Sequence, residues 1–239
     1  MCGGAKLQPR VSVVIPALNE ERALPALLDR LCGDRRLEVL VVDGGSRDRS
    51  VALARSHGAQ VVASAPGRAR QMNAGAAAAR GAFLWFVHAD TDLSVVHVDA
   101  LIAAIDAGLR WGRFDVRITG RSRWFPVISA CMNRRSHWTG IATGDQAICV
   151  DRAVFETVGG FPEIALMEDV ALSARLRLVA WPKRLRPALA TSGRRWENAG
   201  VVRTIVLMWR LRLQFFLGAD PARLAEQYRR PFTGARRWL

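Results

Sequence analysis

Short apolar runs alternate with helical patterns in the N-terminal half of the chain. Four runs are apolar almost throughout and rich in β-branched or aromatic residues: 11–15 (VSVVI), 37–42 (LEVLVV), 59–64 (AQVVAS) and 82–87 (AFLWFV). Helical patterns separate them, at about 19–31 with Asn19 as the N-cap, at 48–56, and through the alanine-rich stretch that ends at Arg80. Strands that are apolar on both faces and separated by helices predict an α/β fold, in which helices cover both faces of a mainly parallel sheet.

The C-terminal half is less regular. The pattern predicts helices at 95–109, 168–178 and 201–217, and strands at 112–118 and 141–150. No internal repeat and no Pro/Ser-rich linker interrupts the chain. We therefore expect one domain over residues 10–195 and a helical C-terminal extension over 196–239.

The helix predicted at 201–217 carries an apolar stripe. Its arginines lie off that stripe, which is formed at helical spacing by Val202, Ile205, Val206, Trp209, Leu213 and Phe216. Such a stripe favours packing on the domain or a contact in a homodimer. The alternative is an interfacial helix that lies on anionic lipid, which would suit a lipid-linked substrate.

The amino-acid composition excludes a disordered protein and indicates the charge of the binding partner. Half of the 239 residues are hydrophobic, which supports a sizeable core and excludes a disordered chain. Lys and Arg number 35 against 21 Asp and Glu, a formal net charge of +14. This excess favours an anionic partner: the phosphates of a small molecule, a membrane surface or nucleic acid.

The spacing of the cysteines and the length of the apolar runs indicate the cellular compartment of the protein. The four cysteines lie far apart without a CxxC pair, which argues against a zinc ribbon and a disulfide framework. The first ten residues lack an apolar signal-peptide core, and no uncharged apolar run reaches 18 residues. We expect a cytoplasmic protein, with peripheral contact at the inner face of the membrane as an alternative.

Acidic residues follow three of the predicted strands. The first strand is followed by Asn19 and Glu20, the second ends in Asp43-Gly44-Gly45-Ser46, and the fourth ends in His88-Ala89-Asp90-Thr91-Asp92. In open α/β sheets, ligands bind beyond the carboxyl ends of the parallel strands. Carboxylates there would repel a nucleotide diphosphate unless a divalent cation bridged them, and such oxygen ligands suit Mg²⁺ or Mn²⁺.

Several ordered motifs resemble a known family. The segments VSVVIPALNE, VVDGGSRDRS, FLWFVHADTDL, VGGFPE and MEDVALSARLR are similar to those of family 2 glycosyltransferases, and closest to a small bacterial subgroup whose acidic motif reads HADT. The resemblance runs in collinear order over residues 10–230. It implies a GT-A (Rossmann-like) fold with a mixed, mainly parallel sheet. It also implies metal-assisted, inverting transfer of a sugar from a UDP- or GDP-linked donor to a hydroxyl acceptor.

The resemblance also implies site residues. The usual DDGS motif reads Asp43-Gly44-Gly45-Ser46 here, and the DxD motif reads His88-Ala89-Asp90. Asp90 is then the expected metal ligand, while His88 either touches metal or phosphate or holds the loop. The implied nucleotide-binding residues are Pro16, Ala17, Asn19, Glu20, Asp43, Arg68, Arg70 and Asn73.

For the chemical step, the resemblance implies Asp169 as the general base and Glu168 as a supporting or acceptor-binding group. On the sequence alone, two acids at a helix start are better explained as complements of the helix dipole, and the collinear upstream motifs reverse that preference. Gly144, Asp145 and Gln146 match the floor of the donor-sugar and acceptor site. A turn before a strand explains these three residues equally well.

Two other classes of protein remain as alternatives. The net charge suggests a nucleic-acid-binding protein, but the arginines are scattered and no helix-turn-helix, RRM or zinc-finger signature is present. A sugar nucleotidyltransferase shares a related fold, but PALNE stands where its glycine-rich signature would be. We therefore expect a nucleotide-sugar donor and a hydroxyl acceptor, and no specific nucleic acid.

Overall fold

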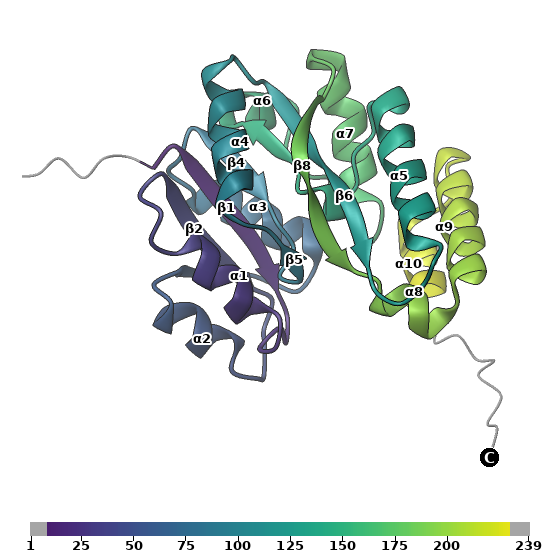
Figure 1. Cartoon of the computed structure of the whole chain (residues 1–239), viewed down its shortest axis with the longest axis horizontal. Coiled ribbons are helices and arrows are strands. Elements are labelled where there is room, and N and C mark those ends of the chain that lie inside the picture. Colours follow the sequence, from purple (N-terminus) through teal and green to yellow (C-terminus); the bar gives the residue numbers. More distant parts are fainter. Residues whose placement is uncertain (1–8, 230–239) are drawn as a thin grey trace, which may run out of the picture.

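The computed structural model describes residues 9–229, without the side chains of Arg194, Arg195 and Asn198. These residues form an eight-stranded sheet in the order β3-β2-β1-β4-β7-β6-β8-β5. The strands are β1 (Val11–Ala17), β2 (Leu37–Asp43), β3 (Gln60–Ala63), β4 (Phe83–Phe86), β5 (Thr91–Asp92), β6 (Trp111–Thr119), β7 (Cys149–Asp151) and β8 (Lys183–Ser192). Figure 1 shows helices on both sides of this sheet.

The sheet is mixed, with a parallel half that the sequence predicts. Strands β3, β2, β1 and β4 are parallel neighbours. β7 then runs antiparallel to both β4 and β6. β6 and β8 pair in parallel, and the short β5 closes the edge antiparallel to β8. The predicted fold class is confirmed.

Two cores lie on opposite faces of the sheet. Because successive side chains of a strand point to opposite faces, Val13 and Ile15 of β1 enter one core and Val14 enters the other. The first core is covered by α1 (Leu24–Leu31), α2 (Ser50–Ser56) and α4 (Val95–Asp106). The second is covered by α3 (Arg68–Ala78), α6 (Arg152–Thr157) and α7 (Glu168–Val179).

A buried carboxylate ties the amino-terminal ends of β1 and β2 to the segment after α3. Glu38 accepts hydrogen bonds from Ser12 Oγ (2.6 Å), from the Arg80 backbone N–H (2.7 Å) and from Arg80 Nε (2.6 Å). The backbone N–H of Gly81 donates to Ser12 Oγ (2.8 Å). Burial alone would raise the pKa of Glu38, but these donors outweigh it and lower that pKa.

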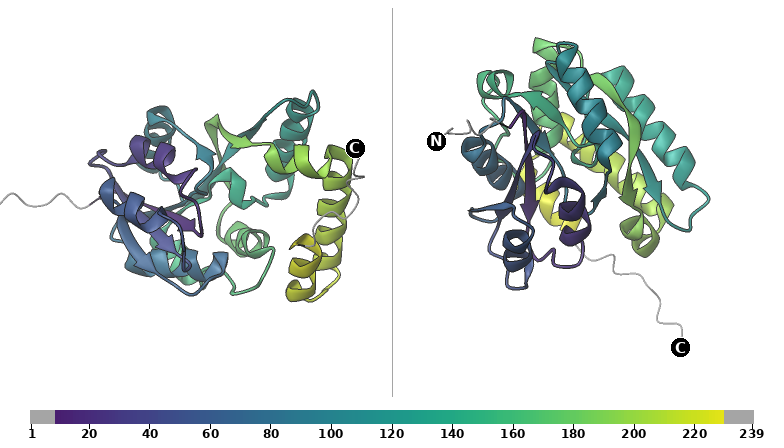
Figure 2. Two further views of the ribbon diagram at one scale, coloured as in Figure 1. Left: turned by 90° about the horizontal axis from the view of Figure 1, so that it is seen from below. Right: turned by 60° about the vertical axis from the view of Figure 1, so that its left-hand side comes forward.

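The C-terminal helices extend the molecule at the end away from β2 and β3 (Figures 1 and 2). They are α8 (Arg194–Ala199), α9 (Val201–Phe216) and α10 (Pro221–Arg229), which lie near α5 (Phe125–Thr139). Leu211 of α9 and Leu224 of α10 pack with Met167 and Val170 at the start of α7. Trp196 and Ile205 pack on a second cluster around Phe125. In the described part of the chain, no helix is long and apolar enough to cross a membrane.

Two predicted elements differ from the structure. The helix expected from Asn19 begins at Leu24. Asn19 has a left-handed backbone (φ 57°) instead of the extended one usual at an N-cap, and its side chain accepts from the Arg47 backbone instead of capping a helix. The strand expected at 141–150 is reduced to β7, because residues 144–146 form a 3₁₀ turn. Ala147, also at positive φ (47°), follows that turn.

The apolar stripe of α9 does not pack on the domain as a whole. Five of its six residues are exposed: Val202 (73%), Val206 (58%), Trp209 (72%), Leu213 (61%) and Phe216 (68%). The helix packs instead through the neighbouring face that carries Leu207, Leu211 and Phe215. The stripe thus remains an apolar surface of the single chain.

Candidate active site

One cavity of about 1440 Å³ begins at the carboxyl ends of β1 and β4. From there it extends between α5, α7 and α9, which form its other walls. The cavity brings together ten of the residues that the sequence predicts for the site: Pro16, Ala17, Glu20, Arg68, His88, Asp90, Gly144, Asp145, Glu168 and Asp169.

Asn19 and Asp43 hold the loops after β1 and β2 and do not line this cavity. Asp43 accepts hydrogen bonds from the backbone N–H groups of Gly45 (3.0 Å) and Ser46 (3.1 Å). Asn19 accepts one from the Arg47 backbone (2.9 Å) and donates its own backbone N–H to Ser46 Oγ (2.9 Å). Their polar groups shape the turn that supports the cavity rim.

Three more predicted residues serve the scaffold. Arg70 pairs with Glu163 (Nε to Oε2, 3.2 Å) at the surface. The Asn73 amide donates to the Phe161 carbonyl (2.8 Å) and accepts from the Phe161 N–H (3.0 Å), which fixes the Gly-Gly-Phe-Pro loop. The buried Gln146 accepts from the Thr143 backbone (3.2 Å). None of the three lines the cavity.

Gln71, which the sequence analysis missed, explains the glycine in the DGGS motif. Its buried amide donates to the carbonyls of Ala17 (2.9 Å) and Val42 (2.8 Å), so it bridges the ends of β1 and β2. A Cβ on Gly44 would stand 3.0 Å from Gln71 Nε2. An acid at position 44 would therefore push the bridging amide away. The available signal was a second amide, two residues before Asn73, at the start of the alanine-rich helical stretch.

Asp169 is held at the cavity wall by two backbone donors. The Gly144 N–H donates to Asp169 Oδ2 (2.7 Å), and the Val170 N–H donates to Oδ1 (2.7 Å). Met167, at the N-cap of α7, has a left-handed backbone (φ 69°) that turns the chain into this helix. The carboxylate is half-buried and has a fixed orientation toward the cavity that it lines.

Glu168 lies beside Asp169 and pairs with Arg68 (Oε1 to Nη1, 3.4 Å). Only 3% of Glu168 is exposed. Burial and the negative charge of Asp169 raise the pKa of Glu168, while Arg68 opposes the rise. Burial would lower the pKa of Arg68, but the charges of Glu168 and Asp169 outweigh it and raise that pKa. Arg68 therefore brings a permanent positive charge to the wall.

Asp145 and Arg135 form a second polar group on the cavity wall. Thr143 Oγ1 donates to Asp145, and burial together with the charge of Asp169 raises the pKa of Asp145. Arg135 was missed by the sequence analysis, and its Nε and Nη2 are buried without a hydrogen-bond partner. Burial lowers the pKa of Arg135, although the charges of Asp145 and Asp169 oppose this. Arg135 thus has donors left for a ligand.

The HADT segment contributes His88 and Asp90 to the cavity. Burial, aided by the charge of Arg68, lowers the pKa of His88 to about 3, so its imidazole is neutral. His88 Nε2 is buried without a hydrogen-bond partner and lies 2.6 Å from where a Cβ on Gly144 would be. Asp90 is exposed on the cavity side, whereas Asp92 pairs with Arg30 of α1.

The possible metal ligands of the cavity, Asp90 and His88, fit a cation that is bound together with a substrate. Among residues 9–229, no group of three or more His, Cys, Asp or Glu side chains could hold a metal ion by itself. Mg²⁺ is usually held by one or two carboxylates together with substrate phosphates, so a protein cage is not required. Asp90 offers such a carboxylate, and the neutral, unpartnered His88 offers a nitrogen ligand.

The sequence profile of Glycosyl transferase family 2 matches residues 12–159 of the chain. The chain belongs to this family. The match spans β1 to α6 and contains the strand ends that carry Asp43 and Asp90 and the 3₁₀ turn that carries Asp145. Membership confirms the resemblance to family 2 and favours the glycosyltransferase hypothesis over the nucleic-acid-binding and nucleotidyltransferase alternatives.

Curated glycosyltransferases are similar to this chain over part of their length. An uncharacterised glycosyltransferase of Mycobacterium tuberculosis is 36% identical over 133 residues, which are 55% of this chain and 54% of that protein. A probable glycosyltransferase of Bacillus subtilis is 27% identical over 237 residues, 88% of this chain and 55% of that protein. The chain spans about half the length of these relatives.

Solved glycosyltransferases share the fold. Residues 1–349 of Staphylococcus aureus TarS superpose with a TM-score of 0.62 at 18% identity, covering 77% of this chain and 60% of that one. Glucosyl-3-phosphoglycerate synthase from Mycobacterium tuberculosis, solved with Mg²⁺ and uridine diphosphate, gives a TM-score of 0.59 at 19% identity, over 77% of this chain and 70% of that one. These structures confirm the GT-A fold.

Proposed function

We propose that the protein transfers a sugar from a nucleotide diphosphate sugar to an acceptor hydroxyl, with inversion at the anomeric carbon. One observation carries this proposal: Arg68, Asp90 and Asp169 line a single cavity at the carboxyl ends of β1 and β4. Family membership supports the reaction class. Structural neighbours solved with UDP-GlcNAc, and with Mn²⁺ and UDP, support a uridine donor, with guanosine as the alternative.

The donor diphosphate would lie between Arg68 and Asp90. Arg68 offers the guanidinium charge that oxygen anions bind well. Asp90, with His88 as a second ligand, would hold Mn²⁺ or Mg²⁺, which would supply positive charge beside the departing diphosphate. Pro16, Ala17 and Glu20 form the wall for the nucleoside.

Asp169 would act as the general base. Its carboxylate takes the proton of the acceptor hydroxyl while that oxygen attacks the anomeric carbon. The bond from this carbon to the diphosphate oxygen breaks on the opposite face, and its electron pair leaves with the nucleoside diphosphate. The backbone donors of Gly144 and Val170 fix the orientation of the base. Glu168 positions Arg68, and Asp145 with Arg135 offers hydrogen bonds to sugar or acceptor hydroxyls.

Asp169→Asn tests this assignment. Asn keeps an oxygen that accepts from Gly144 but cannot take a proton, so we expect release of nucleoside diphosphate to fall by about 10²- to 10⁴-fold. Release is measured from UDP- and GDP-sugars, with an extract of bacterial lipids and glycans as the source of acceptor. The nucleotide should still raise the melting temperature of the variant.

Glu163→Gln is the matched control, because Glu163 pairs with Arg70 at the surface and lies outside the cavity. It should release nucleoside diphosphate at the wild-type rate. An Asp169→Asn variant that turns over as fast as the control would refute the proposed base.

A further inference from the structure

The cavity is larger than a nucleotide sugar requires. Its volume of about 1440 Å³ exceeds the roughly 300–1,000 Å³ of an ordinary small-molecule pocket. The polar groups assigned to the donor and the base line the part that begins at β1, β4 and α7. The remainder lies between α5 and α9 and is available for a second substrate.

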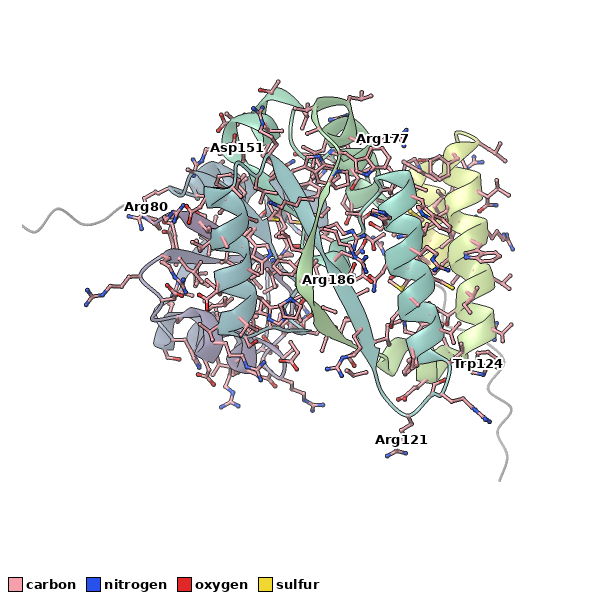
Figure 3. The ribbon with its side chains drawn as sticks, turned by 45° about the horizontal axis from the view of Figure 1, so that its top comes forward. Arg80, Arg121, Trp124, Asp151, Arg177 and Arg186 are labelled. Carbon is pink, nitrogen blue, oxygen red and sulfur yellow. The ribbon has the colours of Figure 1, made fainter. Side chains whose placement is uncertain are left out.

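That remainder has mainly apolar walls. Two helix faces supply it, one from the N-terminal two-thirds of α5 and the other from α9. The α5 wall consists of Trp124, just before the helix, with Val127, Ile128, Cys131 and Met132. The α9 wall consists of Val201, Val202, Ile205, Met208 and Trp209, together with the polar Thr204 and Arg212. Figure 3 shows Trp124 at the N-terminal end of α5, beside α9. Such walls offer apolar surface to a ligand and few hydrogen bonds.

The α5 face changes from apolar to polar toward the catalytic carboxylates. Trp124, Ile128, Met132 and Arg135 recur every three or four residues, so they lie on one face of the helix. At 1.5 Å per residue, Trp124 and Arg135 are about 16 Å apart along the axis. The negative charges of Asp145 and Asp169 act on Arg135, whose Nε and Nη2 are buried without a hydrogen-bond partner. The Arg135 end of the α5 face can therefore donate hydrogen bonds to a polar group of a ligand.

At its other end the cavity opens onto apolar surface. Val202 and Trp209 line the cavity and also belong to the exposed stripe of α9. An apolar chain too long for the cavity would leave it along this stripe. A second copy of the protein could cover the stripe, but the space between α5 and α9 lies inside one chain.

We propose that the acceptor is an amphipathic lipid-like molecule. Its hydroxyl lies at Asp169, other oxygens of its polar head accept from Arg135, and its apolar body lies between α5 and α9. The position of the hydroxyl rests on the proposed function, whereas the place of the apolar body rests on the cavity walls alone. A fully polar glycan acceptor would leave these walls without apolar partners.

Quenching of tryptophan fluorescence tests the inference on the whole chain. Trp124, Trp196 and Trp209 line the cavity, so the bromine of 11-bromoundecan-1-ol should quench them in a saturable way. Undecan-1-ol should compete for the site. Because 3-bromopropan-1-ol lacks the apolar body, it should need at least about tenfold higher concentration, equivalent to about 1.4 kcal/mol.

Met208→Gln and Val206→Gln provide matched variants. Met208 lines the cavity, whereas Val206 lies two residues away on the exposed stripe and outside the cavity wall. Gln is nearly isosteric with Met, so Met208→Gln should weaken binding of 11-bromoundecan-1-ol about tenfold by making the wall polar. Val206→Gln should bind it like the wild type. Thermal stabilisation by UDP with Mn²⁺ should be equal in both variants.

The outcomes separate this inference from the proposed function. Equal quenching by the long and short alcohols, or unchanged binding in Met208→Gln, would overturn the apolar acceptor site. Stabilisation by nucleotide without quenching that depends on chain length would overturn this inference alone. Quenching that depends on chain length without any nucleotide stabilisation would overturn the proposed function and leave an apolar ligand site.

Discussion

Gly144 shows how closely the residues of this site depend on one another. Its backbone N–H orients Asp169, and its missing side chain leaves room for His88. An added Cβ would stand 2.6 Å from His88 Nε2 and 3.6 Å from Asp169 Oδ2. The first distance is far inside van der Waals contact, so the imidazole or the loop would have to move. Position 144 therefore couples the HADT segment to the proposed base.

Gly144→Ala should destabilise the fold by about 1–3 kcal/mol through this clash. In a His88→Ala background the space is free, so the same substitution should cost less, with a coupling of about 0.5–3 kcal/mol. Urea unfolding of the wild type, both single variants and the double variant measures this coupling. Purely additive effects would show that His88 and Gly144 do not share the space as described.

At the residue scale, the sequence predicted the acids better than the amides. Asp90 and Asp169 stand in ordered motifs, and the structure brings both to the cavity. Asn73 lies in a similar motif, yet its amide is used by the loop at Phe161. Arg135 lies outside the motifs. Only tertiary packing brings it toward Asp145 and Asp169, so the sequence did not indicate its place in the site. A motif indicates which residues matter but not which polar groups the fold already uses.

At the element scale, the Glu38 network fastens the opposite end of the parallel sheet. Glu38 on β2 receives hydrogen bonds from Ser12 on β1 and from Arg80 after α3. Its pKa is lower in the folded chain than its unfolded value, which is about 4.3. The network therefore stabilises the fold above that unfolded value, and the contribution disappears as the pH falls through the lowered folded pKa.

Glu38→Gln should accordingly lower the free energy of unfolding by about 1–3 kcal/mol at pH 7. This range stays modest because Arg80 is largely exposed to solvent, which screens its charge. The difference from the wild type should shrink as the pH falls below about 4. Urea unfolding at several pH values measures it, with Glu163→Gln as the surface control. A difference that stays constant with pH would argue against an ionised, network-bound Glu38.

The sequence pattern predicted the strands that are buried on both faces, but it did not predict β8 or α5. β1, β2 and β4 are apolar almost throughout and are buried on both faces, so their pattern indicates interior strands of a covered sheet. β8 (KRLRPALATS) mixes cations with a proline, and α5 (FPVISACMNRRSHWT) has no single apolar stripe. One side of α5 packs on β6, while another lines the cavity. Because both sides carry apolar residues, the helix shows no single apolar stripe.

At the scale of the whole molecule, the C-terminal helices close one side of the cavity that begins at the carboxyl ends of β1 and β4. The wall formed by α9 meets walls from α5 and α7, and clusters on either side of it hold the helix in place. The sequence predicted this helix and assigned its stripe to packing on the domain or to a homodimer contact, with anionic lipid as the alternative. Periodicity does not show which of these the stripe meets. The excess of positive charge in the sequence pointed to an anionic partner, which fits the proposed donor.

The most direct test of the proposed donor site is nucleotide-dependent thermal stability in Asp90→Asn and Asp92→Asn. Asp90 lines the cavity, whereas Asp92, two residues away, pairs with Arg30 outside it. With Mn²⁺ and UDP or GDP at about a hundred times the dissociation constant, the wild type and Asp92→Asn should each gain about 2.7 kcal/mol. Asp90→Asn should lose the part of this gain that depends on the metal. Full metal-dependent stabilisation of Asp90→Asn, or none in the wild type, would contradict the proposed donor site.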